Sequence, residues 1–186
     1  MIIVMGTPGA GKSTVLGEAS KDRKEWTVVN YGDLMVDIAK EKKLVSSRDE
    51  LRKLSVANQR TIQAAVGDKL SKMGGKVILD THCSINTPQG YYPGLPNSLL
   101  AKLRVDALVL VNAPLEDILG RRKSDTARVR DAQVREELAE HIRINEAMLA
   151  AYSVLSGAPV LIIDNANGKL DVAVERLEAL LGSFKA

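Results

Sequence analysis

The sequence predicts an α/β fold built on one parallel sheet, because short apolar runs alternate with longer segments of helical period. The runs are mostly aliphatic or β-branched, as in strands that are buried on both faces, and they cover residues 2–5, 26–29, 76–79, 107–111 and 160–164. Two of the intervening segments place apolar side chains on one helix face: Ile62, Val66, Leu70 and Met73 in 56–73, and Val134, Leu138, Ile142, Leu149 and Tyr152 in 131–155. This alternation favours a doubly wound sheet with helices on both faces. Because ligands of such sheets bind beyond the carboxyl ends of the strands, we expect the functional residues directly after each strand.

The length and composition are those of a single globular domain over residues 1–186. A lone cysteine, Cys83, offers neither an internal disulfide nor a cysteine cluster for a metal, which favours a reducing compartment. No apolar run approaches the roughly 20 residues that cross a bilayer, and Met1 is not followed by the pattern of a signal peptide. We therefore expect a cytoplasmic protein without a membrane partner. A net charge of +3 with 3% aromatic residues gives little support for nucleic-acid binding.

A phosphate-binding motif follows the first predicted strand. The segment Gly6–Ser13 matches G-x-x-x-x-G-K-[ST], in which backbone amides and a helix N-terminus surround phosphate oxygens. Lys12 would bridge the β- and γ-phosphates of a nucleotide, and the Ser13 hydroxyl would ligate Mg²⁺. The motif lies between a strand and a helix, as its mechanism requires, so we expect a nucleotide site rather than a glycine-rich turn. The expected contacts are Gly6, Thr7, Pro8, Gly9, Ala10, Gly11, Lys12, Ser13 and Thr14.

The segment 79–96 is expected to be a stiff loop that follows the third strand. It holds three of the six prolines of the chain, and it is either a surface connector or the wall of a substrate site. Asp80 is expected to hold a Mg²⁺-bound water, the alternative being a simple turn former. His82 is either a substrate contact or a packing residue. Gly90 and Gly94 are expected to permit a close approach of the backbone.

Arginines cluster in "ILGRRKSDTARVRD", where Arg121, Arg122, Arg128 and Arg130 lie within ten residues. We expect a short lid over residues 121–131 that closes on transferring phosphates; the alternatives are a solvated helix face and a nucleic-acid patch. After the last predicted strand, "DNANG" (164–168) is expected either near the nucleotide base or as a simple turn.

The region 31–60, between the second and third strands, is where a second substrate is expected. A phosphate acceptor needs no general base, and Arg52 would offset its charge. A hydroxyl acceptor would need a carboxylate base, either Asp33 or Asp80. Arg48 is expected to be a helix-surface charge paired with Asp49 or Glu50, and the same alternative stays open for Arg52.

Several segments together resemble the archaeal-type adenylate kinases over nearly the whole chain: "GTPGAGKST", "VNYGDLM", "LRKL", "DTHCSINTPQGYYPGLP", "ILGRR" and "ARVRD". The resemblance implies a P-loop kinase fold with a five-stranded parallel sheet, a small insertion at 31–60 that binds AMP, and a homotrimer. It implies transfer of the γ-phosphoryl group of Mg-ATP to AMP, which gives two ADP. The implied catalytic residues are Lys12, Arg121, Arg128 and Arg130, the implied AMP contacts are Gly32, Asp33, Arg52, His82, Gly90 and Tyr91, and the implied metal residues are Ser13 and, through water, Asp80.

Two alternatives stay open within this fold: a kinase for another nucleoside monophosphate, and a kinase for a small-molecule hydroxyl with Asp33 as base. Bacterial and eukaryotic adenylate kinases carry Gly-Phe-Pro-Arg after the third strand, where this chain has Thr81, His82 and Cys83. A regulatory GTPase is disfavoured, since only "DNANG" stands where a guanine-reading Asn-Lys-x-Asp is expected.

Overall fold

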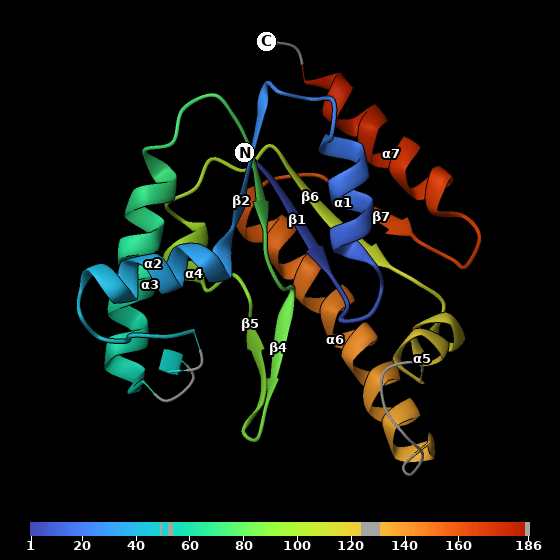
Figure 1. The fold of residues 1–186 in the computed structure, drawn as a ribbon, viewed down its shortest axis with the longest axis horizontal. Helices are drawn as coiled ribbons and strands as arrows, with labels where there is room; N and C mark the ends of the chain where they lie inside the picture. Colours follow the sequence, from blue (N-terminus) through green and yellow to red (C-terminus); the bar gives the residue numbers. More distant parts are fainter. Residues whose placement is uncertain (49, 52–53, 124–130, 185–186) are drawn as a thin grey trace.

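The computed structural model describes residues 1–48, 50–51, 54–123 and 131–184. Five parallel strands form one sheet in the order β2-β3-β1-β6-β7 (Figure 1). Their bounds are β1 Ile2–Gly6, β2 Trp26–Asn30, β3 Lys76–Asp80, β6 Ala107–Asn112 and β7 Val160–Asp164. The predicted five-stranded parallel sheet is thereby confirmed, and each strand ends within one residue of its predicted bound.

Helices cover both faces of the sheet because successive side chains of a buried strand point in opposite directions. On one face, α1 (Lys12–Ser20) and α7 (Leu170–Ser183) pack on the even-numbered side chains of β1. On the other, α2 (Tyr31–Glu41), α3 (Val56–Ser71), α4 (Asn97–Leu100) and α6 (Asp131–Ser156) pack on Ile3 and Met5. The remaining helix, α5 (Leu115–Lys123), packs through Ile118 against Ala10 and the α6 residue Leu138.

The two predicted amphipathic helices are α3 and α6. Ile62, Val66 and Leu70 of α3 are buried, while Met73 lies beyond the helix end and packs on the same core. In α6, Leu138, Leu149 and Tyr152 are buried. No helix within the described residues is both long and apolar enough to cross a membrane.

The segment 79–96 differs from its prediction, because it contains a β-hairpin rather than an irregular loop. Strands β4 (Ser84–Thr87) and β5 (Gly90–Pro93) pair antiparallel and project away from the main sheet (Figure 1). Each strand has only four residues, and prolines in the segment argue against a strand when it is considered alone. The pairing depends on the partner strand, which the apolar pattern of either half does not reveal.

The hairpin returns tightly against its own start at Gly94. A Cβ on Gly94 would lie 1.8 Å from the carbonyl oxygen of His82, and the Gly94 amide donates to the Cys83 carbonyl at 2.9 Å. The predicted close approach is therefore confirmed at Gly94. At Gly90 no atom lies within 4 Å of an added Cβ, and the φ of +109° indicates a turn requirement.

We expect Gly94→Ala to lower the free energy of unfolding by about 3 kcal/mol, since a Cβ there overlaps backbone rather than a flexible side chain. Urea denaturation followed by circular dichroism measures this change. The matched control is Gly74→Ala, at a position with no atom within 4 Å of the new Cβ and no positive φ. Equal stabilities for the two variants would contradict the packing described.

Candidate active site

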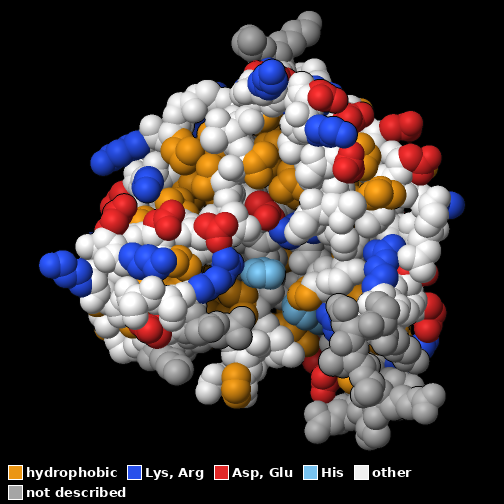
Figure 2. Space-filling view, in the orientation of Figure 1, with side chains coloured by type: hydrophobic (Ala, Val, Ile, Leu, Met, Phe, Trp, Pro, Cys, Tyr) orange, Lys and Arg blue, Asp and Glu red, His pale blue; other side chains and the backbone are white. Residues whose placement is uncertain are grey.

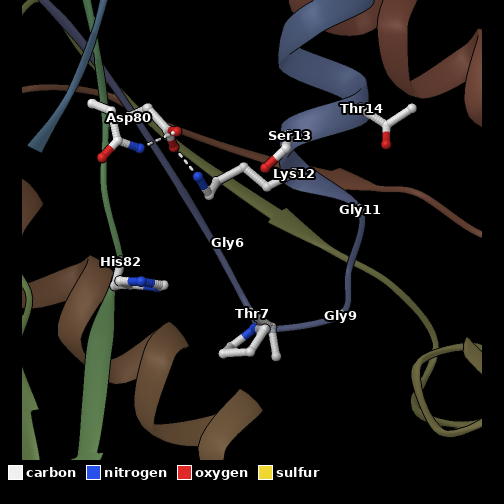
Figure 3. A pocket seen from close by; sticks show the side chains of 11 residues that line it. Gly6, Thr7, Gly9, Gly11, Lys12, Ser13, Thr14, Asp80 and His82 are labelled. Atoms are coloured by element: carbon white, nitrogen blue, oxygen red, sulfur yellow. Dashed lines mark hydrogen bonds and ion pairs between the residues drawn. The ribbon is translucent and has the colours of Figure 1, made fainter. Parts of the chain in front are cut away.

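A cavity of about 460 Å³ lies at the carboxyl ends of β1, β2 and β3 (Figure 3). Its lining comes from the phosphate-binding motif with Thr14 and from residues at or just after the ends of β2 and β3: Gly6, Thr7, Pro8, Gly9, Gly11, Lys12, Ser13, Thr14, Asn30, Asp80 and His82. Of the nine residues expected to contact donor phosphates, only Ala10 does not line the cavity. The sequence motif therefore forms one end of the cavity, and Asn30 and His82 extend it toward the next two strands.

The P-loop, residues 6–13, takes its shape from its glycines. Gly9 and Gly11 have φ values of +92° and +82°, in the left-handed region that L side chains rarely adopt. Gly11 is also the N-cap of α1, and its carbonyl accepts the amides of Thr14 and Val15. The N-terminus of α1 therefore opens at the cavity, where its dipole favours an anion.

The outer side of the P-loop is held through the carbonyl of Ala10. Asn165 Nδ2 donates to this oxygen at 2.8 Å and Arg121 Nη1 at 3.2 Å. Arg121 Nη2 also donates to the Asn165 carbonyl at 2.8 Å, and Asn167 Oδ1 accepts from Arg121. The "DNANG" turn therefore contacts the loop and Arg121, and Arg121 supports the loop from outside the cavity lining.

Lys12 reaches into the cavity and forms an ion pair with Asp80 (Figure 3). The other carboxylate oxygen of Asp80 accepts from Asn30 Nδ2 at 2.9 Å, because Asn30 and Asp80 are register partners at the ends of β2 and β3. Both charged side chains are mostly buried, with 14% and 12% of their surfaces exposed. Burial disfavours the charged ammonium and lowers the pKa of Lys12 to about 8. The buried ammonium is suited to a polyanion that can replace the single carboxylate.

Hard oxygen groups for Mg²⁺ are present but few. The Ser13 hydroxyl is exposed and Ser13 lines the cavity with Asp80. Among the described residues, no group of three or more His, Cys, Asp or Glu side chains could enclose a metal ion. This donor set fits Mg²⁺, which commonly keeps waters and takes most other ligands from bound phosphates.

His82 lines the cavity at the end opposite the P-loop glycines (Figure 3). The pKa of His82 is lowered, first by partial desolvation and then by the positive charges of Lys12, His141 and Arg48. The imidazole is therefore neutral at neutral pH, and the charges that act on it make this end of the cavity favourable for an anion. In Figure 2 the histidine side chains lie in a hollow that has Lys and Arg side chains on both sides.

Arg48 has a different partner from the one expected. It forms an ion pair with Asp33 at the start of α2, while the Glu50 carboxylate accepts from Ser46 and Ser47. The guanidinium lies over Gly32, where a Cβ would be 2.7 Å from Arg48 Nη2. Arg48 therefore joins Gly32 and Asp33 beside the cavity, and the prediction of a pair with Glu50 is wrong.

Other predicted acceptor residues are not brought to the cavity. Gly90 is exposed at the hairpin turn, and the Tyr91 ring packs on His141 of α6 with ring centroids 5.0 Å apart. Asp33, the base of the hydroxyl-kinase alternative, is absent from the lining and is paired with Arg48. Arg52, Arg128 and Arg130 lie outside the described residues.

Comparison with known proteins identifies the family. A family described as an AAA domain matches residues 5–139. The adenylate kinase of Methanocaldococcus jannaschii is 42% identical over 187 residues, covering 97% of each chain. The adenylate kinase of Thermoplasma acidophilum is 45% identical and covers 92% of each. The chain belongs to the adenylate kinase family.

Solved structures of other kinases share the fold of this chain at low sequence identity. A shikimate kinase from Bacteroides thetaiotaomicron matches with a TM-score of 0.61 at 14% identity, covering 97% of each chain. A shikimate kinase from Acinetobacter baumannii in complex with shikimate has a TM-score of 0.58 at 17% identity, covering 100% of this chain and 94% of the other. These matches confirm the P-loop kinase fold and carry no information on the acceptor.

Sequence reasoning missed Asn30 and Asn145 of this chain, and it included Asn165 only as part of the "DNANG" segment (164–168). Asn30 caps α2 by accepting the Asp33 amide at 3.0 Å, and it also binds Asp80. Asn165 holds the P-loop, and Asn145 of α6 donates to the Thr7 hydroxyl at 3.2 Å. Position after a strand could have identified Asn30 and Asn165. Asn145 lies within a helix, and only its buried location sets it apart.

We expect nucleotide binding to raise the pKa of Lys12 above its value of about 8, because polyphosphate stabilises the ammonium. The complex then holds more protons than the empty protein, so ATP binding at about pH 8.5 takes up protons, and affinity falls as the pH rises through this range. Calorimetric titration in two buffers of different ionisation enthalpy measures the uptake. Lys12→Arg is the control, since a guanidinium stays protonated. Undiminished uptake in Lys12→Arg would contradict the assignment.

Proposed function

We propose that the protein transfers the γ-phosphoryl group of ATP reversibly to AMP, giving two ADP. The observation that carries the proposal is a single cavity with a phosphate-binding loop at one end and Asn30 and His82 at the other. Two phosphorylated substrates can meet there at Lys12, in a chain whose relatives are adenylate kinases.

The donor end binds the triphosphate through backbone and charge. Amides of the P-loop and the N-terminus of α1 would surround the phosphate oxygens, and Lys12 would leave Asp80 to bridge the β- and γ-phosphates. Ser13 and Asp80 would hold Mg²⁺ together with the nucleotide, Asp80 through water. When bound, the ion supplies positive charge to the phosphate oxygens.

The acceptor end needs positive charge rather than a base, because the attacking oxygen of a monophosphate is already anionic. Arg48 is the described arginine nearest to this role: it lies over Gly32, is bound to Asp33 and influences His82. We propose that the monophosphate binds between Arg48 and His82, with Asp33 orienting the guanidinium. This arrangement disfavours a hydroxyl acceptor with Asp33 as base, since the Asp33 carboxylate accepts from Arg48.

Other parts of the proposal rest on the family resemblance. We infer that residues 31–60 form the AMP-binding insertion and residues 121–131 the lid, with Arg52 at the acceptor and Arg128 and Arg130 on the transferring phosphate. Gly90 and Tyr91 do not line the cavity. We therefore propose them as acceptor contacts only in a conformation in which the hairpin has closed on the bound nucleotides. A cytoplasmic homotrimer is proposed on the same ground.

Incubation with Mg-ATP and each nucleoside monophosphate in turn tests the reaction. We expect ADP formation to be fastest with AMP, and we expect strong inhibition by two adenosines joined through five phosphates, because that compound occupies both ends of the cavity. Lys12→Ala should lower kcat by about two orders of magnitude or more. Faster turnover with CMP or UMP would contradict AMP as the preferred acceptor, and no transfer to any monophosphate would refute the reaction.

Arg48→Ala is expected to raise the KM for AMP by about 10- to 100-fold, the loss typical of a charge-assisted hydrogen bond of about 1.5–3 kcal/mol. The KM for ATP should change little, because Arg48 lies on the acceptor side. Steady-state kinetics with each substrate varied separates the two constants. Arg60→Ala is the matched control, since Arg60 is exposed on α3 and does not line the cavity. Equal increases in both KM values would contradict an acceptor role.

A further inference from the structure

Asn145 of α6 touches both the P-loop and the base of the β4–β5 hairpin. Its side chain is fully buried. Asn145 Nδ2 donates to Thr7 Oγ1 at 3.2 Å, and its Oδ1 accepts from Ser84 Oγ at 2.5 Å. Its backbone carbonyl accepts from Cys83 Sγ at 3.2 Å. Asn145 therefore joins Thr7 and Ser84, which are 77 positions apart in the chain.

The burial of this amide is meaningful because a buried polar group without partners costs about 1–3 kcal/mol. A leucine of similar size would fill the same position without that requirement. Thr7 and Ser84 are themselves buried, with 2% of each residue exposed, so all three polar side chains depend on one another. A buried, hydrogen-bonded network of this kind holds its members in one arrangement.

The same face of α6 anchors the hairpin base by contacts that do not include the P-loop. The Tyr152 hydroxyl donates to the Cys83 carbonyl at 2.8 Å. The amide of Leu95 donates to the Tyr152 hydroxyl at 3.4 Å. Of these helix residues, Asn145 is the one whose side chain bonds to a P-loop residue.

The two ends of this network lie beside the two ends of the cavity. The Thr7 carbonyl accepts the Ala10 amide within the P-loop, and the Thr7 amide donates to the Val111 carbonyl of β6. Cys83 and Ser84 directly follow His82 in the chain. His82 and Thr7 both line the cavity, His82 at its proposed acceptor end (Figure 3). Ordering of the P-loop around phosphates is thus connected to the backbone next to His82.

We propose that Asn145 is a positioning residue that couples the donor and acceptor sites, so that a nucleotide on the P-loop tightens binding at the acceptor end. The inference rests on the proposed function, because it requires two nucleotides. Because the network holds its members in one arrangement, a shift of Thr7 on phosphate binding is carried through Asn145 to Ser84 and the backbone beside His82. Coupling of this kind is reciprocal: each nucleotide strengthens the other by the same factor.

The experiment measures that factor by calorimetry. AMP is titrated into the protein alone and into the protein saturated with Mg²⁺ and adenylyl imidodiphosphate, a non-transferring analogue of ATP. In the unchanged protein we expect AMP to bind at least about fivefold more tightly in the presence of the analogue. In Asn145→Leu and in Ser84→Ala the factor should fall to about one. Ser84→Ala keeps the proposal testable if Asn145→Leu does not fold.

Tyr152→Phe is the matched control. It removes a hydroxyl from the same helix that anchors the same segment, but it leaves the bonds of Asn145 in place. We expect lower thermal stability with an unchanged coupling factor. Equal loss of coupling in Tyr152→Phe would overturn the proposal, since anchoring of the hairpin by α6 would then be sufficient. An unchanged factor in both Asn145→Leu and Ser84→Ala, or AMP binding without coupling in the unchanged protein, would also overturn it.

Failure of the proposed function gives a different result. In that case the unchanged protein binds no AMP in either titration and transfers no phosphoryl group, and the inference falls with it. AMP binding and transfer without coupling would refute the inference alone.

Discussion

Burial of the sheet on both faces is the constraint on which the rest of the structure depends. Helices cover β1, β3 and β6 so completely that polar side chains are excluded from the strand interiors. Polar groups are accordingly found where the strands end, and in a parallel sheet those ends meet at one edge. Gly6, Asn30 and Asp80 end their strands at this edge, and the cavity forms there. The position of the chemistry therefore follows from the way the core is covered.

Charge at this edge is balanced within the protein. The buried ammonium of Lys12 forms an ion pair with Asp80, which also accepts a hydrogen bond from Asn30. At the proposed acceptor side, Arg48 forms an ion pair with Asp33. Each cation has one carboxylate partner that a bound phosphate can replace or reorient. The desolvation that lowers the pKa of Lys12 also strengthens its attraction to an anion that enters. The proposed donor and acceptor positions therefore each hold a cation that a phosphorylated substrate would bind.

Helix α6 connects these parts because one of its faces carries polar side chains at helical spacing. Asn145 and Tyr152 hold the start and end of the β4–β5 hairpin, and Asn145 also donates to Thr7. The hairpin base and the P-loop are thus parts of one buried, hydrogen-bonded unit.

The sequence by itself determined whatever depends on neighbouring residues: the strands from their continuous apolar runs, α3 and α6 from apolar period, and the phosphate site from the glycine spacing of Gly6–Ser13. It also pointed to Asp80 and His82, because both follow a strand. Only the tertiary structure decided the β4–β5 pairing, the partners of Lys12 and Arg48, and the role of Asn145. Lys12 and Asp80 are 68 positions apart, and Thr7 and Asn145 are 138 apart. The spacing of apolar residues along a helix or strand indicates which face of that element is buried. It does not indicate which polar group from a distant part of the chain lies against that face.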